Sequence, residues 1–330
     1  MRLAAVLAAV AAVCALAALA ALHRGGDADP KLVWPVVYVE AADVPRTASV
    51  VEQLPHLELA VLATDGERRR LTENGYADYW PAVSPDGKRI AFTANRDRRG
   101  DVYGDDDLFV MTSGGAPTPL NRDGAKGPRD LWPAWSPDGR RVVFASARIG
   151  DAGAEQFDLF IVDAATGRQR RLTSTSGDES MPAWSPDGHT IAFVGVGRGG
   201  FDLYRRAAAG GPAERLTTTG GRSPDEGFPA FSPDGSALVY SAVRHGTAAA
   251  VYQLDLRTRR ETLLAADDVS LVRPRFSPDG RFLLFVRYPA QWAYAPIVPL
   301  AGEVVVQELA SGRRLRVADG GDADWLAPRR

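Results

Sequence analysis

Acidic side chains recur in the sequence at one offset, three residues before a proline. Asp78, Asp130, Glu179 and Glu226 have this spacing, and Asp324 matches them in a closing segment near the C-terminus. Carboxylates gathered at one mouth of a channel could bind basic groups of a partner. Alternatively, they could accept backbone hydrogen bonds that hold neighbouring parts of the fold together. The choice depends on where the fold places them.

A second acidic segment, residues 95–107, carries enough carboxylates for a calcium loop. The candidate ligands are Asp97, Asp101, Asp105 and Asp106, since calcium prefers carboxylate and carbonyl oxygens. Arg99 stands where an oxygen ligand is expected, and the three arginines of the segment oppose cation binding. The alternative interpretation is a solvated loop with local ion pairs.

Residue sets typical of catalytic centres do not stand out. The sequence contains no Gly-x-Ser-x-Gly, no His-Glu-x-x-His and no Gly-x-x-x-x-Gly-Lys-Ser/Thr, the patterns of common hydrolases and phosphate-binding loops. Residues 195–200 fit Gly-x-Gly-x-x-Gly, but they are expected to join two strands, whereas a dinucleotide site needs a helix N-terminus there. We therefore expect no cofactor, and a binding protein rather than an enzyme.

A repeat explains how these residues are positioned. Ser-Pro-Asp-Gly occurs five times, and successive copies begin 45 to 52 residues apart; the copies start at Ser84, Ser136, Ser185, Ser232 and Ser277. In each copy a short strand leads into the tight turn that Pro-Asp-Gly favours, and an apolar second strand such as 141–144 follows. Third and fourth strands complete the period. Four antiparallel strands per repeat predict the blade of a β-propeller.

Six blades are expected, although the tetrapeptide occurs five times. Residues 32–39, 57–63 and 69–72 have the pattern of second, third and fourth strands of one more blade. The segment Asp324–Ala327 is predicted to supply its missing innermost strand. The sequence thus predicts an all-β, six-bladed propeller over residues 31–330, with the ring closed by a C-terminal strand.

The repeat also resembles a known family. Pro-Ala-Trp-Ser-Pro-Asp-Gly, an Ile-Ala-Phe strand, Asp-Leu-Phe/Tyr and Arg-Leu-Thr are similar to the TolB-type β-propeller repeat over roughly residues 31–328. The resemblance implies an extracytoplasmic propeller that binds a protein or peptide of the cell envelope. Because folds do not determine function, two alternatives remain: a propeller enzyme (a metal-dependent lactonase, hydrolase or lyase) acting at the channel mouth, and a membrane-anchored sensor or structural module.

The N-terminus predicts export. Residues 3–22 are uniformly apolar apart from one cysteine and follow Arg2, so residues 1–24 are expected to be a signal peptide or a signal anchor, and 25–30 a linker. The net charge of -2, from 39 basic and 41 acidic residues, gives no broad attraction to nucleic acid. We expect a periplasmic or otherwise extracytoplasmic monomer, in contact with a membrane only through an uncleaved N-terminus.

Aromatic residues offer a second candidate binding surface. Tyr288, Trp292 and Tyr294 lie in a proline-containing segment between the second and third strands of one blade. They could anchor an interface at the channel mouth, or fold back onto the rim of the propeller. The tryptophans near the first strands could form either blade-to-blade packing or a sugar platform; these are Trp80, Trp132, Trp135 and Trp184.

Overall fold

The computed structural model describes residues 32–41, 57–95, 106–121, 128–149, 155–197, 200–218, 226–244, 248–288 and 302–326. All of them belong to one compact unit, Lys31–Arg330. Within these ranges no helix is long and apolar enough to cross a membrane. The predicted signal segment, 1–24, lies outside the described residues.

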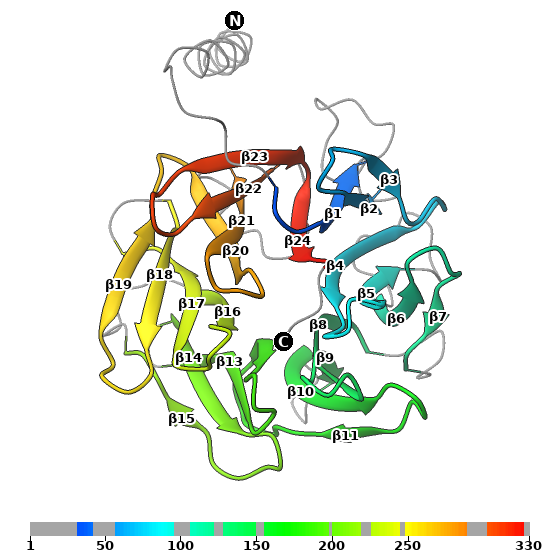
Figure 1. Cartoon of the computed structure of the whole chain (residues 1–330). Helices are drawn as coiled ribbons and strands as arrows, with labels where there is room; N and C mark the ends of the chain where they lie inside the picture. Colours follow the sequence, from blue (N-terminus) through cyan, green and yellow to red (C-terminus); the bar gives the residue numbers. More distant parts are fainter. Residues whose placement is uncertain are drawn as a thin grey trace, which may run out of the picture. The chain divides into compact units, whose positions relative to one another are not determined.

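The described strands form six antiparallel sheets of four strands arranged around a centre, which confirms the predicted six-bladed propeller (Figure 1). The innermost strands are β4, β8, β12, β16, β20 and β24. The blades are β4–β7 (Ala77–Val83, Arg89–Asn95, Asp106–Thr112, Thr118–Pro119), β8–β11 (Asp130–Trp135, Arg141–Ile149, Glu155–Asp163, Gln169–Arg171), β12–β15 (Glu179–Trp184, Thr190–Gly197, Gly200–Ala207, Glu214–Arg215), β16–β19 (Glu226–Phe231, Ala237–Ala242, Ala250–Asp255, Glu261–Ala265), β20–β23 (Ser270–Phe276, Phe282–Tyr288, Glu303–Glu308, Arg314–Asp319) and β24 with β1–β3 (Gly321–Trp325, Val36–Ala41, Leu57–Leu62, Arg68–Arg70).

The core lies between the blades, because the second strand of each blade is apolar on both faces. In β9, Val142 and Phe144 pack against the preceding blade. Val143 and Ala145, which alternate with them, pack against the following blade. All four side chains are fully buried. Since successive residues of a strand face opposite sides, one uninterrupted apolar run lets each sheet contact both of its neighbours.

The Ser-Pro-Asp-Gly turns have the predicted geometry. In the second copy, the Ser136 hydroxyl donates to Asp138 Oδ1 (2.5 Å) and accepts from the backbone N–H of Arg141 (3.0 Å). Gly139 has a φ of 65°, and the matching glycines of the other copies have φ values of 71° or 72°. This left-handed conformation favours glycine. The turn therefore needs the residue types that the repeat supplies.

The ring closes as predicted, by antiparallel pairing of β24 with β1, but the closing strand is displaced in sequence. It runs from Gly321 to Trp325, with Trp325 opposite Val36, whereas the predicted segment was Asp324–Ala327. The buried Trp325 packs between blades, and its Nε1 donates to the Arg275 carbonyl (3.4 Å). Trp135 donates in the same way to Ala82 (3.0 Å). Trp325 thus corresponds to Trp135, and this packing sets the register.

Candidate binding site

A β-bulge in the innermost strands aims one side chain per blade at the central channel. In β4 the register shifts between Tyr79 and Ala82, so that Trp80 and Pro81 together face the single residue Phe92 of β5. Trp80 has a φ of 51°. The equivalent residue before the blade proline has a φ of 51° to 58° in the other four copies; these residues are Trp132, Met181, Phe228 and Arg273.

This backbone conformation is unfavourable for non-glycine residues, by about 1 to 3 kcal/mol each. The following proline has no N–H, so no ladder hydrogen bond is lost by bulging at that position. Bulges re-aim side chains, and here five of them turn toward the channel. In the closing blade, Asp322 holds the same place, three residues before Trp325.

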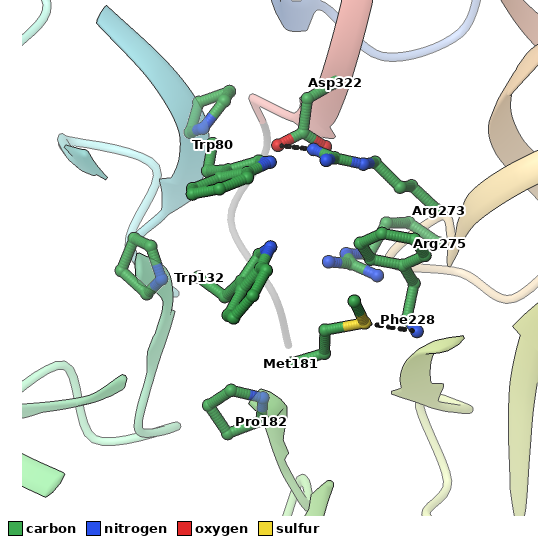
Figure 2. Close-up of a pocket in the computed structure, with 10 residues that line it drawn as sticks. Trp80, Trp132, Met181, Pro182, Phe228, Arg273, Arg275 and Asp322 are labelled. Atoms are coloured by element: carbon green, nitrogen blue, oxygen red, sulfur yellow. Dashed lines mark hydrogen bonds and ion pairs between the residues drawn. The ribbon is translucent and has the colours of Figure 1, made fainter. Parts of the chain in front are cut away.

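The re-aimed side chains surround one cavity that is partly open to solvent (Figure 2). It is lined by Trp80, Pro81, Trp132, Pro133, Met181, Pro182, Phe228, Arg273, Arg275 and Asp322. Each blade contributes at least one residue. The cavity therefore forms only when the ring is complete.

One side of the cavity is aromatic and apolar. The rings of Trp80 and Trp132 lie 4.9 Å apart at 38°, and Met181 Sδ accepts a hydrogen bond from the Phe228 N–H (3.4 Å). The indole N–H groups of Trp80 and Trp132 are buried, and neither has a hydrogen-bond acceptor among the described residues. Trp135 and Trp184 lie in interblade clusters, as the blade-packing interpretation predicts. Trp80 also belongs to such a cluster, and Trp132 packs against two of them.

The opposite side is charged. Arg273 Nη1 and Asp322 Oδ2 form an ion pair of 2.6 Å, and both side chains are buried. The Arg273 guanidinium also lies over the rings of Phe228 (4.6 Å) and Trp80 (5.4 Å). Burial raises the pKa of Asp322, while the guanidinium groups of Arg273 and Arg275 act in the opposite direction. Arg275 lies on the same side of the cavity, and its Nη1 donates to the Pro274 carbonyl (3.1 Å).

Four of the predicted acidic residues share one register, near the start of the innermost strands. They are Asp78, Asp130, Glu179 and Glu226, opposite Ala94, Ser146, Gly195 and Ala242. All four are buried. Each accepts a hydrogen bond from a nearby side chain: Asn74, Asn121, Thr175 and Thr217 respectively. Desolvation raises the pKa of Glu179 and of Glu226. These four donors are side chains, whereas the hydrogen-bonding alternative predicted backbone donors; Glu226 also accepts from the backbone N–H of Leu203 (3.2 Å). The binding role stays a prediction.

Asp324 is not in that register. In β24, Asp324 pairs with Val37 of β1, which is the place that Ala82 holds in β4. Its carboxylate accepts hydrogen bonds from the backbone N–H groups of Val83 and Trp325 (both 2.9 Å). The acidic residue that reaches the cavity is Asp322, which sequence reasoning missed. Aligning Trp325 with Trp135 would have found it, because Asp322 then matches Trp132.

The other predicted residues lie largely outside the described ranges. These are Asp97, Asp101 and Asp105 of the calcium alternative, and Trp292 and Tyr294 of the aromatic segment. Asp106 is buried and accepts from the Tyr79 hydroxyl (2.5 Å) and Arg129 Nε (3.3 Å). Tyr288 ends β21 and is buried in a cluster with Val243 and Val286. Among the described residues, no three acidic, His or Cys side chains form a metal-binding group.

Residues 120–285 match the family model of the TolB beta propeller domain. The chain belongs to this family. A solved structure of TolB from Acinetobacter baumannii is similar to this TolB-type propeller, with a TM-score of 0.69 and 20% identity over 90% of this chain and 68% of that one. A crystal structure of a nidogen/laminin complex contains a similar chain, with a TM-score of 0.63 and 11% identity over 90% of this chain and 99% of that one. At these identities the likeness concerns the fold alone.

One curated protein has a locally similar sequence. It is named uncharacterized peptidase YuxL, from Bacillus subtilis (strain 168), and is 35% identical over 94 residues, which are 28% of this chain. This chain covers 13% of that protein's length. The 94 matched residues equal the length of about two repeats.

Proposed function

We propose that this TolB-type propeller binds a protein or peptide partner of the cell envelope at its central channel. The observation that carries the proposal is the ring of bulge residues: the backbone is alike in each of the five repeats, with φ between 51° and 58°, while the side chains differ in size and charge. Packing alone would be satisfied by one residue type repeated. Different chemistry at equivalent places suits recognition of an asymmetric ligand.

Two further lines support this proposal. The predicted export signal at residues 3–22 favours an extracytoplasmic location. The similar chain in the nidogen/laminin structure comes from a protein complex, and a propeller channel that gathers residues from all blades offers the same kind of concave surface. The predicted aromatic segment with Trp292 and Tyr294 would add contacts at the mouth.

Site-specific photo-cross-linking in the native envelope tests this function. A photoreactive residue is placed at Arg275 in the channel, and, as a control, at the exposed Arg140 of a Ser-Pro-Asp-Gly turn. We expect one discrete protein to be captured from position 275 and not from position 140. Equal capture from both positions, or none from position 275, would count against channel binding.

Catalysis is a second candidate, favoured by the local similarity to a protein named as a peptidase. Purified full chain incubated with peptide, lactone and uronate-containing polysaccharide substrates, with and without a metal chelator, tests it. Turnover that follows the protein through purification and is lost in a channel variant would establish the enzyme.

Anchoring is tested separately, by whether the chain stays in the membrane fraction at high salt.

A further inference from the structure

The indole N–H groups of Trp80 and Trp132 are hydrogen-bond donors that face the channel cavity. Both nitrogens are buried, and neither has an acceptor among the described residues. Trp80 is only 2% exposed. Figure 2 shows both indole nitrogens pointing across the cavity, away from their own strands. Buried donors in folded proteins are normally paired, so these two indicate the place of an acceptor from outside the chain.

The walls of the cavity favour a ligand that accepts hydrogen bonds and donates none. Among the lining side chains, the acceptors are Met181 Sδ and the Asp322 carboxylate. The sulfur already accepts from the Phe228 N–H (3.4 Å), and the carboxylate pairs with Arg273 (2.6 Å). A ligand N–H placed here would lose its hydrogen bond to water without a replacement, which is unfavourable.

The charged side of the cavity does not require a charged ligand. Arg273 is balanced by Asp322, and Arg275 Nη1 donates to the Pro274 carbonyl (3.1 Å). Moving a charged group out of water is costly unless a partner compensates it. The described contacts therefore fit a neutral acceptor.

In a peptide backbone, a neutral group that accepts hydrogen bonds and donates none occurs before each proline. The carbonyl there belongs to a tertiary amide, which has no N–H. The proline ring is apolar, and segments of this kind are extended before they bind, so they lose little entropy on aromatic surfaces. The rings of Trp80 and Trp132, 4.9 Å apart at 38°, supply such a surface together with Met181 and Phe228.

We propose that the cavity binds a proline-containing segment of the partner. Carbonyl oxygens that precede proline accept hydrogen bonds from the indole N–H groups of Trp80 and Trp132. The proline rings pack against the indoles and against Met181 and Phe228. This inference rests on the proposed peptide-binding function and specifies the part of the partner that enters the channel.

Titration of the full chain with matched neutral peptides tests the segment. The probes are the N-acetyl, C-amide forms of Ala-Pro-Pro-Ala and Ala-Ala-Ala-Ala, together with the alanine peptide N-methylated at its two central residues. We expect the proline peptide to bind about tenfold or more tightly than the alanine peptide. The N-methylated peptide, which also lacks the two N–H groups, should bind between them. Equal binding of the alanine and proline peptides overturns the inference.

Two further probes test other classes of ligand. The N-acetyl, C-amide form of Ala-Glu-Glu-Ala carries carboxylates, and a tetramer of N-acetylglucosamine carries sugar rings. Both should bind more weakly than the proline peptide. Tighter binding of the acidic peptide overturns the neutral acceptor, and tighter binding of the oligosaccharide overturns the peptide and assigns the tryptophans to a sugar platform.

Isotope labelling of the tryptophans measures the hydrogen bonds directly by NMR. The chain has seven tryptophans, and single substitutions to Phe assign the indole N–H signals of Trp80, Trp132 and Trp184. The signals of Trp80 and Trp132 should move downfield as the proline peptide binds, because each proton gains an acceptor. Trp184 has an unpartnered indole N–H outside the cavity, so its signal should stay in place. Binding without a shift at Trp80 or Trp132 contradicts the assignment.

A matched pair of variants locates the binding. Trp132→Phe retains a ring and removes the indole N–H, so it should weaken the proline peptide several-fold to about tenfold. Trp184→Phe makes the same change outside the cavity and should bind as wild type does. Equal losses in both variants, or none in Trp132→Phe, overturn the inference. If cross-linking from position 275 captures a partner while the proline peptide does not bind, the inference fails and the proposed function remains.

Discussion

The bulge within the repeat's first strand and the turn that follows this strand behave in opposite ways. At the Ser-Pro-Asp-Gly turn, every copy has the same contact, a serine hydroxyl donating to the aspartate at 2.5 or 2.6 Å. At the channel bulge, the copies share a backbone conformation, but the side chain is tryptophan in two copies and methionine, phenylalanine or arginine in the others. At the bulge, the repeat thus fixes the direction in which the side chain points but not the residue type. At the turn, it fixes both. The turns stabilise the blades, and the bulge residues can serve recognition.

The largest expected effect on stability comes from the Arg273–Asp322 ion pair, which lines the channel and also stabilises the fold. Asp322→Ala leaves buried Arg273 without its counter-ion and should lower the free energy of unfolding by about 3 to 5 kcal/mol. Urea denaturation measures this. The double variant Arg273→Met, Asp322→Leu should recover most of the loss, because methionine already occupies the equivalent bulge at Met181. A single variant as stable as wild type would contradict the structural role of the pair.

At the turn end, Ser136→Ala should cost about 1 to 3 kcal/mol of unfolding free energy, because the buried hydroxyl both donates and accepts. The loss is measured by urea denaturation, and ligand binding at the channel should not change. The comparison would be contradicted if Ser136→Ala lowered the free energy of unfolding by less than a bulge substitution outside the Arg273–Asp322 ion pair, such as Trp132→Phe.

The turn aspartates make a smaller, pH-dependent contribution. Hydrogen bonds from the Ser185 hydroxyl and the His189 backbone N–H hold the pKa of Asp187 below its usual range. A carboxyl whose folded pKa is lowered stabilises the fold above its unfolded pKa of about 4, and this is lost as the pH falls through the folded pKa. Asp187→Ala should therefore cost roughly 1 kcal/mol at pH 7 for this largely exposed group, and less below pH 4. A cost that grows on acidification would contradict the assignment.

The smallest effect on stability is expected at the bulge itself. Trp132→Phe keeps an aromatic ring and removes a buried N–H that has no acceptor among the described residues, so the free energy of unfolding should change by less than about 1.5 kcal/mol. Thermal unfolding measures this directly. A loss equal to that of Asp322→Ala would show that the bulge residues serve the fold.

The fold was largely predictable, because the local signals agree with one another. Pro-Asp-Gly requires a turn, the apolar runs require burial on both faces, and the period requires a blade. The closing register was missed because Asp324 resembles Asp78 in its neighbours, whereas packing of Trp325 between blades decides the pairing.

The candidate site was much less predictable. The left-handed residue before each blade proline runs against the usual preference of that position, so no local propensity reveals the bulge. Its side chains, such as Trp80, Arg273 and Asp322, are far apart in sequence and unlike one another. The acidic residues chosen instead did repeat, and the structure buries four of them, each with a hydrogen bond from a nearby side chain.

The central claim is that the channel recognises a partner and the turn end maintains the fold. Capture of the cross-linked envelope partner by immobilised full chain tests this most directly, with the variant Trp132→Phe, Arg275→Gln compared with Ser136→Ala. The account predicts that the channel variant retains its melting temperature and loses at least tenfold in partner affinity, while the turn variant loses several degrees and retains the affinity. Unchanged affinity in the channel variant, or an equal loss in the turn variant, would contradict it.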